Sequence, residues 1–175
     1  RGLVVTGVQT CALPISDVGY TVGVGAAVQN GVGPQAPHKG APIVGITGDA
    51  GAAYSIMEFE TLGKYRIPAI MIVYNNNAWG VWTSGASRGA VRAQHMYLFQ
   101  ENLRYEKIAE ALGCNGEYVT SPDQMTPALE RAYKLASDEG ISTLINCQGK
   151  KEFWTNQYPP SMPRHFAPGA LAYYK

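Results

Sequence analysis

The side chains best suited to chemistry in this 175-residue chain lie in two short polar segments. Residues 48–51 (GDAG) place the carboxylate of Asp49 among small residues, and residues 75–77 supply three asparagine carboxamides. One carboxylate with neutral oxygens is a poor Ca²⁺ site, but it suits Mg²⁺, which keeps waters and is completed by ligand phosphates. The backbone amides of Ala50 and Gly51 precede a predicted helix and can donate to phosphate oxygens. These residues are consistent with a metal–diphosphate site.

A purely structural interpretation accounts for the same residues. Asp49 would then cap the helix that follows it, and the asparagines would form a turn. Residue types alone leave both interpretations open. Replacing Asp49 by Ala separates them, because it removes Mg²⁺-dependent binding in the first case and costs about 1 kcal/mol of helix capping in the second.

Both polar segments follow predicted buried strands. Residues 43–47 (IVGIT) and 69–74 (AIMIVY) are apolar runs rich in β-branched residues, and residues 55–65 between them have helical spacing. Consecutive strands of a βαβ unit are usually adjacent, and ligands bind beyond the carboxyl ends of such strands. We therefore expect residues 48–51 to form a loop that lies beside the asparagines.

The remaining elements predict a doubly wound, mostly parallel α/β sheet with helices on both faces. Further strands are expected at residues 117–120 and 142–147, and helices at 101–112 and 121–138. The last helix begins with a capping box from Ser121 to Gln124 and stops at Gly140. The Gly- and Ala-rich residues 19–33 suit a helix that packs closely on a sheet or a ligand, and residues 34–41 are predicted to be a loop.

Composition excludes several classes of protein. The formal charge is only +1, from 14 Lys+Arg and 13 Asp+Glu, whereas nucleic-acid binding needs a basic face. Hydrophobic residues make up 46% of the chain, which argues against disorder, and no apolar run reaches the about 18 residues of a membrane span. Cys11, Cys114 and Cys147 form no Cys-x-x-Cys pair, so a reducing, cytoplasmic location is expected.

The amino-terminal segment needs separate treatment. Residues 5–16 (VTGVQTCALPIS) resemble the translation of a sequencing-library adapter, which implies that residues 1–16 are not native and that the natural sequence resumes near Asp17. An ordinary strand at residues 3–8 is one alternative. A signal peptide is the other, although Gly7, Gln9 and Thr10 interrupt its apolar core. The chain does not begin with Met, so we expect a fragment.

The two polar segments together resemble a known cofactor motif. Gly48-Asp49, followed 27 positions after Asp49 by the second residue of Asn75-Asn76, resembles the Gly-Asp-Gly/Ser…Asn-Asn motif of thiamine diphosphate enzymes. The resemblance covers residues 17–154 and implies a diphosphate-binding domain at 17–150. It implies that the side chains of Asp49 and Asn76 and the backbone carbonyl of Ala78 hold Mg²⁺. Ala50 replaces the usual Gly or Ser but keeps its amide, so diphosphate binding is expected to survive.

Further stretches resemble one branch of that family. Residues 48–68, 104–107 and 144–146 resemble 2-hydroxyacyl-CoA lyases and oxalyl-CoA decarboxylases. This implies a carbon–carbon lyase or decarboxylase acting on a small-molecule acyl-CoA or 2-keto acid. An acetolactate synthase-type carboligase stays open, as does a helix-packing role for several of these residues. A non-catalytic phosphate-binding α/β module is the alternative of another class, but Val28 stands where a Gly-x-Gly-x-x-Gly loop needs its third Gly.

The resemblance assigns further cofactor contacts. Thr21-Val22 resembles the Thr-Met pair whose apolar residue props the bent cofactor, although Val22 also suits a core position. Trp79 and Gly80 come directly after Ala78 and are expected to contact the cofactor, with core packing as the alternative for Trp79. The activating Glu is expected in a missing pyrimidine-binding domain of a partner chain. The fragment therefore holds no catalytic residue and is expected to be inactive alone, and the parent is expected to form a homodimer or homotetramer.

The carboxyl-terminal residues 151–175 are rich in Pro and aromatic residues. Related enzymes fold their tail over the active site, which makes Phe153, Trp154 and Tyr158 candidates for a lid. A mobile tail is the alternative. We treat residues 151–175 as a segment distinct from the domain at 17–150.

Overall fold

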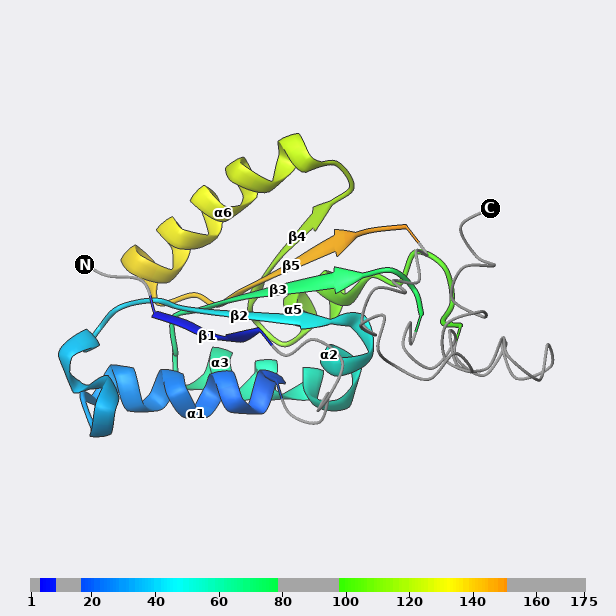
Figure 1. The fold of residues 1–175 in the computed structure, drawn as a ribbon. Coiled ribbons are helices and arrows are strands. Elements are labelled where there is room, and N and C mark those ends of the chain that lie inside the picture. The colour runs from blue at the N-terminus through cyan, green and yellow to red at the C-terminus, as the bar shows by residue number, and fades with distance from the viewer. Residues whose placement is uncertain (1–3, 9–16, 79–97, 151–175) are drawn as a thin grey trace, which may run out of the picture. The chain divides into compact units, whose positions relative to one another are not determined.

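The computed structural model describes residues 4–8, 17–78 and 98–150. These residues contain a five-stranded parallel sheet of order β1-β2-β3-β5-β4 (Figure 1). The strands are β1 Val4–Val8, β2 Ile43–Gly48, β3 Ala69–Asn75, β4 Asn115–Val119 and β5 Thr143–Gln148.

Helices cover both faces of this sheet. In Figure 1, α1 and α3 lie on one side of the strands and α6 lies on the other. The helices are α1 Asp17–Asn30, α2 Asp49–Ser55, α3 Phe59–Lys64, α5 Tyr105–Ala111 and α6 Met125–Lys134. Shorter helical segments are η1 Gly33–His38, η2 Ile56–Glu58, η4 Pro122–Gln124 and the π-helical η5 Leu135–Glu139. The predicted doubly wound α/β class is confirmed.

The chain divides into two compact units. Unit 1 comprises Arg1–Asn75 and Arg104–Gln148 and contains the sheet. Unit 2 comprises Asn76–Leu103 and Gly149–Lys175. Within the described part of unit 2, Ala78 and Leu98 form an antiparallel β-bridge.

The face of the sheet under α6 is an apolar core. Successive strand residues point to opposite faces, so Val44, Ile70 and Ile145 share this one. They pack in one cluster with Val119 and with three alanines, Ala128, Ala132 and Ala136. Small alanine side chains let a helix lie close to the branched side chains of the strands.

The opposite face carries α1, which approaches the sheet closely at Gly25. A Cβ atom at Gly25 would lie 2.3 Å from Cγ2 of Ile67 and 2.8 Å from Cδ1 of Ile43. A larger residue at this position would require the two isoleucine side chains or the helix to shift. The expectation that the Gly- and Ala-rich segment packs closely on a sheet is therefore confirmed.

Two predicted loops contain helical structure instead. Residues 34–41 were expected to be a loop, but η1 occupies most of them, with Pro near its first position, where no amide donor is needed. The loop prediction for residues 48–51 is also wrong. Gly48 is extended and ends β2, so α2 begins directly at Asp49.

Two predicted helices have different bounds. Residues 55–65 were expected to form one helix, but the segment passes from the end of α2 through η2 into α3. The helix expected from residue 101 begins only at Tyr105, because Asn102 adopts a left-handed φ of 57° that interrupts a helix. The capping box at Ser121 is confirmed, and the following helical run ends at Glu139, before Gly140.

The amino-terminal strand β1 pairs in parallel with β2. It lies within residues 1–16, of which residues 5–16 resemble an adapter, and its conformation agrees with the alternative of a strand at 3–8. The origin of this segment stays a prediction, and residues 9–16 and 151–175 lie outside the described residues.

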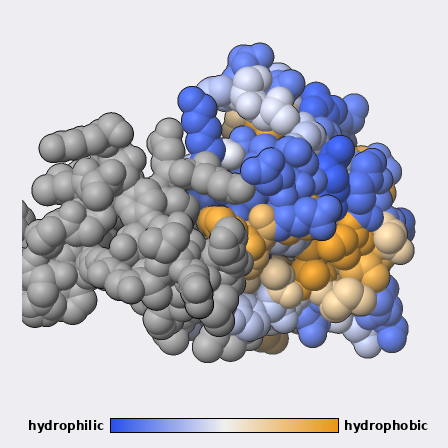
Figure 2. Space-filling view, turned by 90° about the vertical axis from the view of Figure 1, so that its right-hand side faces the viewer, coloured by the Kyte–Doolittle hydropathy of each residue, from blue (hydrophilic) through white to orange (hydrophobic). Residues whose placement is uncertain are grey.

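The surface is mixed in polarity. Figure 2 shows a hydrophobic area beside a largely hydrophilic one on the face that it presents. Among the described residues, no helix combines the length and apolar character needed to cross a membrane. Large hydrophobic side chains with more than half of their surface exposed are Tyr20, Val32, Tyr54, Met57, Tyr65 and Tyr74.

Candidate functional site

The carboxyl ends of β2 and β3 meet at one edge of the sheet, as the sequence predicts. Gly48 of β2 lies opposite Tyr74 of β3, so Asp49 follows one strand where its neighbour reaches Asn75. On the other side of β3, Asn75 lies opposite Gln148 of β5. Three adjacent strands therefore end at this edge, and each carries a polar residue at or directly after its end.

Asp49 is a buried carboxylate at the start of α2. The residue is only 3% exposed, and its Oδ1 accepts a hydrogen bond of 2.8 Å from the amide of Ala50. Ala50, Gly51 and Ala52 in the same helix are also buried. Burying an ionised carboxylate is costly unless cations or donors compensate its charge.

The donor set of the described residues fits Mg²⁺ better than a transition metal. These residues contain no group of three or more His, Cys, Asp or Glu side chains able to hold a metal ion. A metal at Asp49 would therefore complete its shell with neutral oxygens, waters and ligand phosphates. Mg²⁺ accepts such a shell, whereas zinc takes several His or Cys ligands.

The asparagine segment turns sharply after β3. Oδ1 of Asn76 accepts a hydrogen bond of 3.2 Å from the amide of Ala78, and the carbonyl of Asn77 accepts one of 2.9 Å from the amide of Phe99. Asn77 adopts a left-handed φ of 56°, which Asn tolerates better than most residues. The predicted turn is thus present within unit 2.

The predicted metal set of Asp49, Asn76 and Ala78 draws on both units, because Asp49 belongs to unit 1 and the other two belong to unit 2. Its role in metal binding stays a prediction. Trp79 and Gly80, the other expected cofactor contacts of this segment, lie outside the described residues.

Thr21 and Val22, predicted to contact the cofactor, lie in α1. Thr21 is buried and its hydroxyl donates to the carbonyl of Asp17 at 2.9 Å, one helical turn earlier. Thr47, at the end of β2, donates its hydroxyl to the carboxylate of Asp17. Val22 is half-buried, so it stays open whether it supports the bent cofactor or packs in the core.

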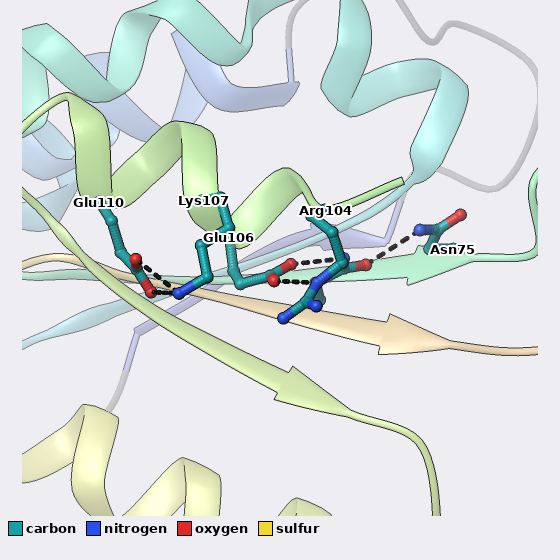
Figure 3. A network of polar contacts seen from close by, with 6 residues as sticks. Asn75, Arg104, Glu106, Lys107 and Glu110 are labelled. Atoms are coloured by element: carbon teal, nitrogen blue, oxygen red, sulfur yellow. Dashed lines mark hydrogen bonds and ion pairs between the residues drawn. The ribbon is translucent and has the colours of Figure 1, made fainter. Parts of the chain in front are cut away.

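A second buried carboxylate, Glu106 of α5, anchors a polar network (Figure 3). Asn146 Nδ2 donates to Glu106 Oε2 at 2.7 Å, and Asn75 Nδ2 donates to Asn146 Oδ1 at 3.1 Å. Glu106 is 1% exposed, and both asparagines are fully buried. Glu106 Oε1 accepts from Nε of Arg104, whose guanidinium lies 4.1 Å from the centre of the Tyr118 ring. The network connects α5, β5 and β3.

Tyr105 places the start of α5 within electrostatic reach of Asp49. Burial raises the pKa of Tyr105 to about 12, with a smaller contribution from the negative charge of Asp49. The hydroxyl therefore keeps its proton at neutral pH and remains a hydrogen-bond donor. Since α5 also carries Glu106, this one helix approaches both buried carboxylates.

Sequence reasoning did not assign Tyr105, Glu106 or Asn146 to the site. Their segments, 104–107 and 144–146, entered only as stretches that resemble a family. A signal was present, because Asn146 interrupts an apolar strand and Glu106 lies among the buried residues of its helix, where apolar side chains are the rule. A polar residue at a buried position indicates a specific partner.

Comparison with known proteins identifies the cofactor class of this fold. The family model for the C-terminal TPP-binding domain of thiamine pyrophosphate enzymes matches residues 9–147. A solved benzoylformate decarboxylase from Polynucleobacter necessarius has the same fold, with a TM-score of 0.62 and 19% identity over 76% of this chain and 23% of that one.

Curated relatives with three different activities match part of this chain. A 2-hydroxyacyl-CoA lyase from Oryza sativa subsp. japonica is 32% identical, with 59% of this chain and 19% of the relative covered. An oxalyl-CoA decarboxylase from Escherichia coli (strain K12) is 30% identical, with 75% and 22% covered. An acetolactate synthase large subunit from Mycobacterium tuberculosis is 30% identical, with 59% and 18% covered. The chain thus spans about a fifth of the length of these relatives.

Proposed function

This chain belongs to the thiamine pyrophosphate enzymes and contains their C-terminal TPP-binding domain, and from this premise we propose that it holds thiamine diphosphate through Mg²⁺. The side chains of Asp49 and Asn76 and the carbonyl of Ala78 would bind the metal. The observation that carries the proposal is the buried carboxylate of Asp49 where β2 ends beside β3. A carboxylate oxygen at this edge of the sheet is a ligand of the kind that Mg²⁺ takes in proteins.

Each residue of the proposed site has a limited task. Asp49 supplies the one negative charge, and its burial keeps water from weakening its attraction to a cation. The end of β2 is open beside Gly48, since a Cβ at this position would meet nothing closer than 4.0 Å. Val22, half-buried on α1, would contact the organic part of the cofactor.

We propose further that the complete enzyme is a carbon–carbon lyase or decarboxylase acting on 2-hydroxyacyl-CoA, oxalyl-CoA or 2-keto acids. When bound, the thiazolium ring supplies an electron sink for breaking a bond next to a carbonyl. The names of the lyase and decarboxylase relatives support this class, and the acetolactate synthase relative supports carboligation as the second candidate. The activating Glu and the remaining substrate contacts would come from an upstream domain.

We also propose a homodimeric or homotetrameric assembly through those upstream domains, and a cytoplasmic location. Cys114 and Cys147 are both free thiols. Burial raises the pKa of the Cys114 thiol to about 11, and it raises the pKa of Cys147 as well. Both thiols are therefore protonated and unreactive at neutral pH, as expected for cysteines that pack as small apolar residues.

The first test is titration of thiamine diphosphate into the complete enzyme with and without Mg²⁺. We expect metal-dependent binding that weakens by about 100-fold or more in Asp49→Ala, because the only proposed carboxylate ligand is lost. Asp138→Ala is the matched control, since it removes an exposed carboxylate from η5.

Two results would contradict the proposal. Thiamine diphosphate binding that needs no Mg²⁺ would show that the metal is not part of the site. Wild-type affinity in Asp49→Ala, with a loss of stability of only about 1 kcal/mol, would identify Asp49 as a helix cap. Turnover assays with acyl-CoA and 2-keto acid substrates then separate the lyase from the carboligase candidate.

A further inference from the structure

We propose that Glu106 is a positioning residue for the metal segment, residues 76–78: acting through Asn146, it fixes the carboxamide of Asn75, the residue directly before the proposed metal ligand Asn76. This inference rests on the proposed function, because it concerns the same metal site. It adds a residue of α5 that has no place in the metal motif itself.

The order of donors and acceptors in the network starts at the carboxylate. An ionised carboxylate only accepts hydrogen bonds, so Glu106 obliges Asn146 to turn its Nδ2 towards it. Asn146 must then turn its Oδ1 towards Asn75, and Asn75 must answer with its own Nδ2. The charge of Glu106 thereby sets the orientation of two carboxamides in succession.

Asn75 is held by its backbone as well as by its side chain. Gln148 Nε2 donates to the carbonyl oxygen of Asn75 at 3.1 Å, and the two residues are opposite each other in the β3–β5 ladder. The last residue of β3 therefore has a defined backbone and a defined side-chain orientation. Asn76 follows it through one peptide bond, so the residue directly before the metal segment is fixed in both its backbone and its side chain.

The close packing of α5 on β4 explains how Glu106 reaches Asn146. A Cβ at Gly116 of β4 would lie only 2.6 Å from the carbonyl oxygen of Glu106, so the helix backbone touches the strand where a side chain is missing. This brings the Glu106 carboxylate within reach of Asn146. Stability alone does not require a buried carboxylate here, because apolar residues in the same space often stabilise a protein as well as a buried ion pair does. The polar network therefore suits a role in orienting Asn146 and Asn75.

Glu106→Gln tests the order of donors directly. Arg104 only donates, so the substituted glutamine must turn its oxygen to Arg104 and its Nε2 to Asn146. Asn146 and Asn75 then have to reverse, and the anchor before Asn76 is misdirected. We expect Mg²⁺-dependent binding of thiamine diphosphate to the complete enzyme to weaken about tenfold, the size typical for residues that orient metal ligands.

A second substitution restores the order. When Glu106→Gln is combined with Asn146→Asp, the glutamine donates to the new carboxylate, which again accepts from Asn75. We expect the double variant to bind within about threefold of the wild type, whereas Asn146→Asp alone sets two carboxylates face to face and binds weakly. This coupling is what a double-mutant cycle measures.

Glu110→Gln is the matched control on the same helix, because Glu110 forms an exposed pair with Lys107 at 2.8 Å (Figure 3). It should leave the affinity unchanged. Urea unfolding of every variant supplies the structural readout. A merely structural role for Glu106 would shift the unfolding midpoint of Glu106→Gln and leave the affinity of its folded form intact.

The outcomes separate this inference from the proposed function. Wild-type affinity in Glu106→Gln, or a loss that Asn146→Asp does not rescue in folded protein, overturns the positioning role, provided that Asp49→Ala still weakens binding by about 100-fold or more. Absence of Mg²⁺-dependent binding in the wild type overturns the proposed function, and the positioning role with it.

Discussion

Two neighbouring residues of β5 show how differently the two faces of this sheet are built. Ile145 and Asn146 are both fully buried. Ile145 points into the apolar cluster under α6, which it shares with alanines and branched strand residues. Asn146 points to the other face and exchanges hydrogen bonds with Glu106 and Asn75.

This difference assigns different tasks to the two faces. Apolar burial is non-directional and tolerates many shapes, so the α6 face contributes mainly to stability. Buried hydrogen bonds require fixed partners and fixed angles, so the α5 face determines where particular atoms lie. The α5 face also holds Asn75, directly before the metal segment.

The largest effect is expected from Ile145→Ala. The substitution leaves a cavity in the cluster under α6 and should lower the free energy of unfolding by about 2–5 kcal/mol. Urea unfolding of the 175-residue chain measures it. The affinity of folded complete enzyme for thiamine diphosphate should not change, and a weakened affinity in folded protein would show that the two faces are not separate in function.

An effect of intermediate size is expected from the ionisation of Tyr105, which belongs to α5. The ordinary tyrosine pKa is 10.0 and that of Tyr105 is about 12, so the folded chain binds this proton more tightly than the unfolded chain. Stability is therefore unaffected below pH 10 and falls as pH rises from 10 to 12, by about 2 kcal/mol at the upper limit. Unfolding of wild type and Tyr105→Phe across this range isolates the effect, since Phe removes it. Parallel curves would mean that Tyr105 titrates normally.

The smallest effect is expected from Ser121→Ala. Ser121 directly precedes η4 and α6, the helical run that packs on the apolar cluster. The capping box formed with Gln124 is lost, which should cost about 1 kcal/mol of stability. Thr126→Ala, an exposed position in the first turn of α6, is the control and should change stability by much less. A loss as large as that of Ile145→Ala would mean that the cap supports more than the helix end.

Much of the fold follows from local signals. The strands around residues 43–47, 69–74 and 142–147 are predictable because their apolar runs suit burial on both faces. The capping box at Ser121 and the stop before Gly140 are predictable because each depends on a few adjacent residues. The start of α5 was missed, since the left-handed Asn102 is a conformation that the residue type permits but does not require.

The candidate site divides in the same way. The spacing of Asp49 and Asn76 is a property of the sequence, and so is the family that it resembles. The sequence could not show that Glu106 reaches Asn146, 40 positions away, or that Asn146 reaches Asn75, 71 positions away. Both contacts require the strand order in which β5 lies beside β3.

The sequence by itself thus determined the class of fold, the positions of the buried strands and the motif for the cofactor, because these depend on composition and spacing along the chain. Only the tertiary structure decided which polar residues meet beneath α5 and which apolar residues meet beneath α6. The physical reason is that hydrogen bonds and packing act over a few ångströms in space, and the chain brings distant residues within that range only when the whole sheet has formed.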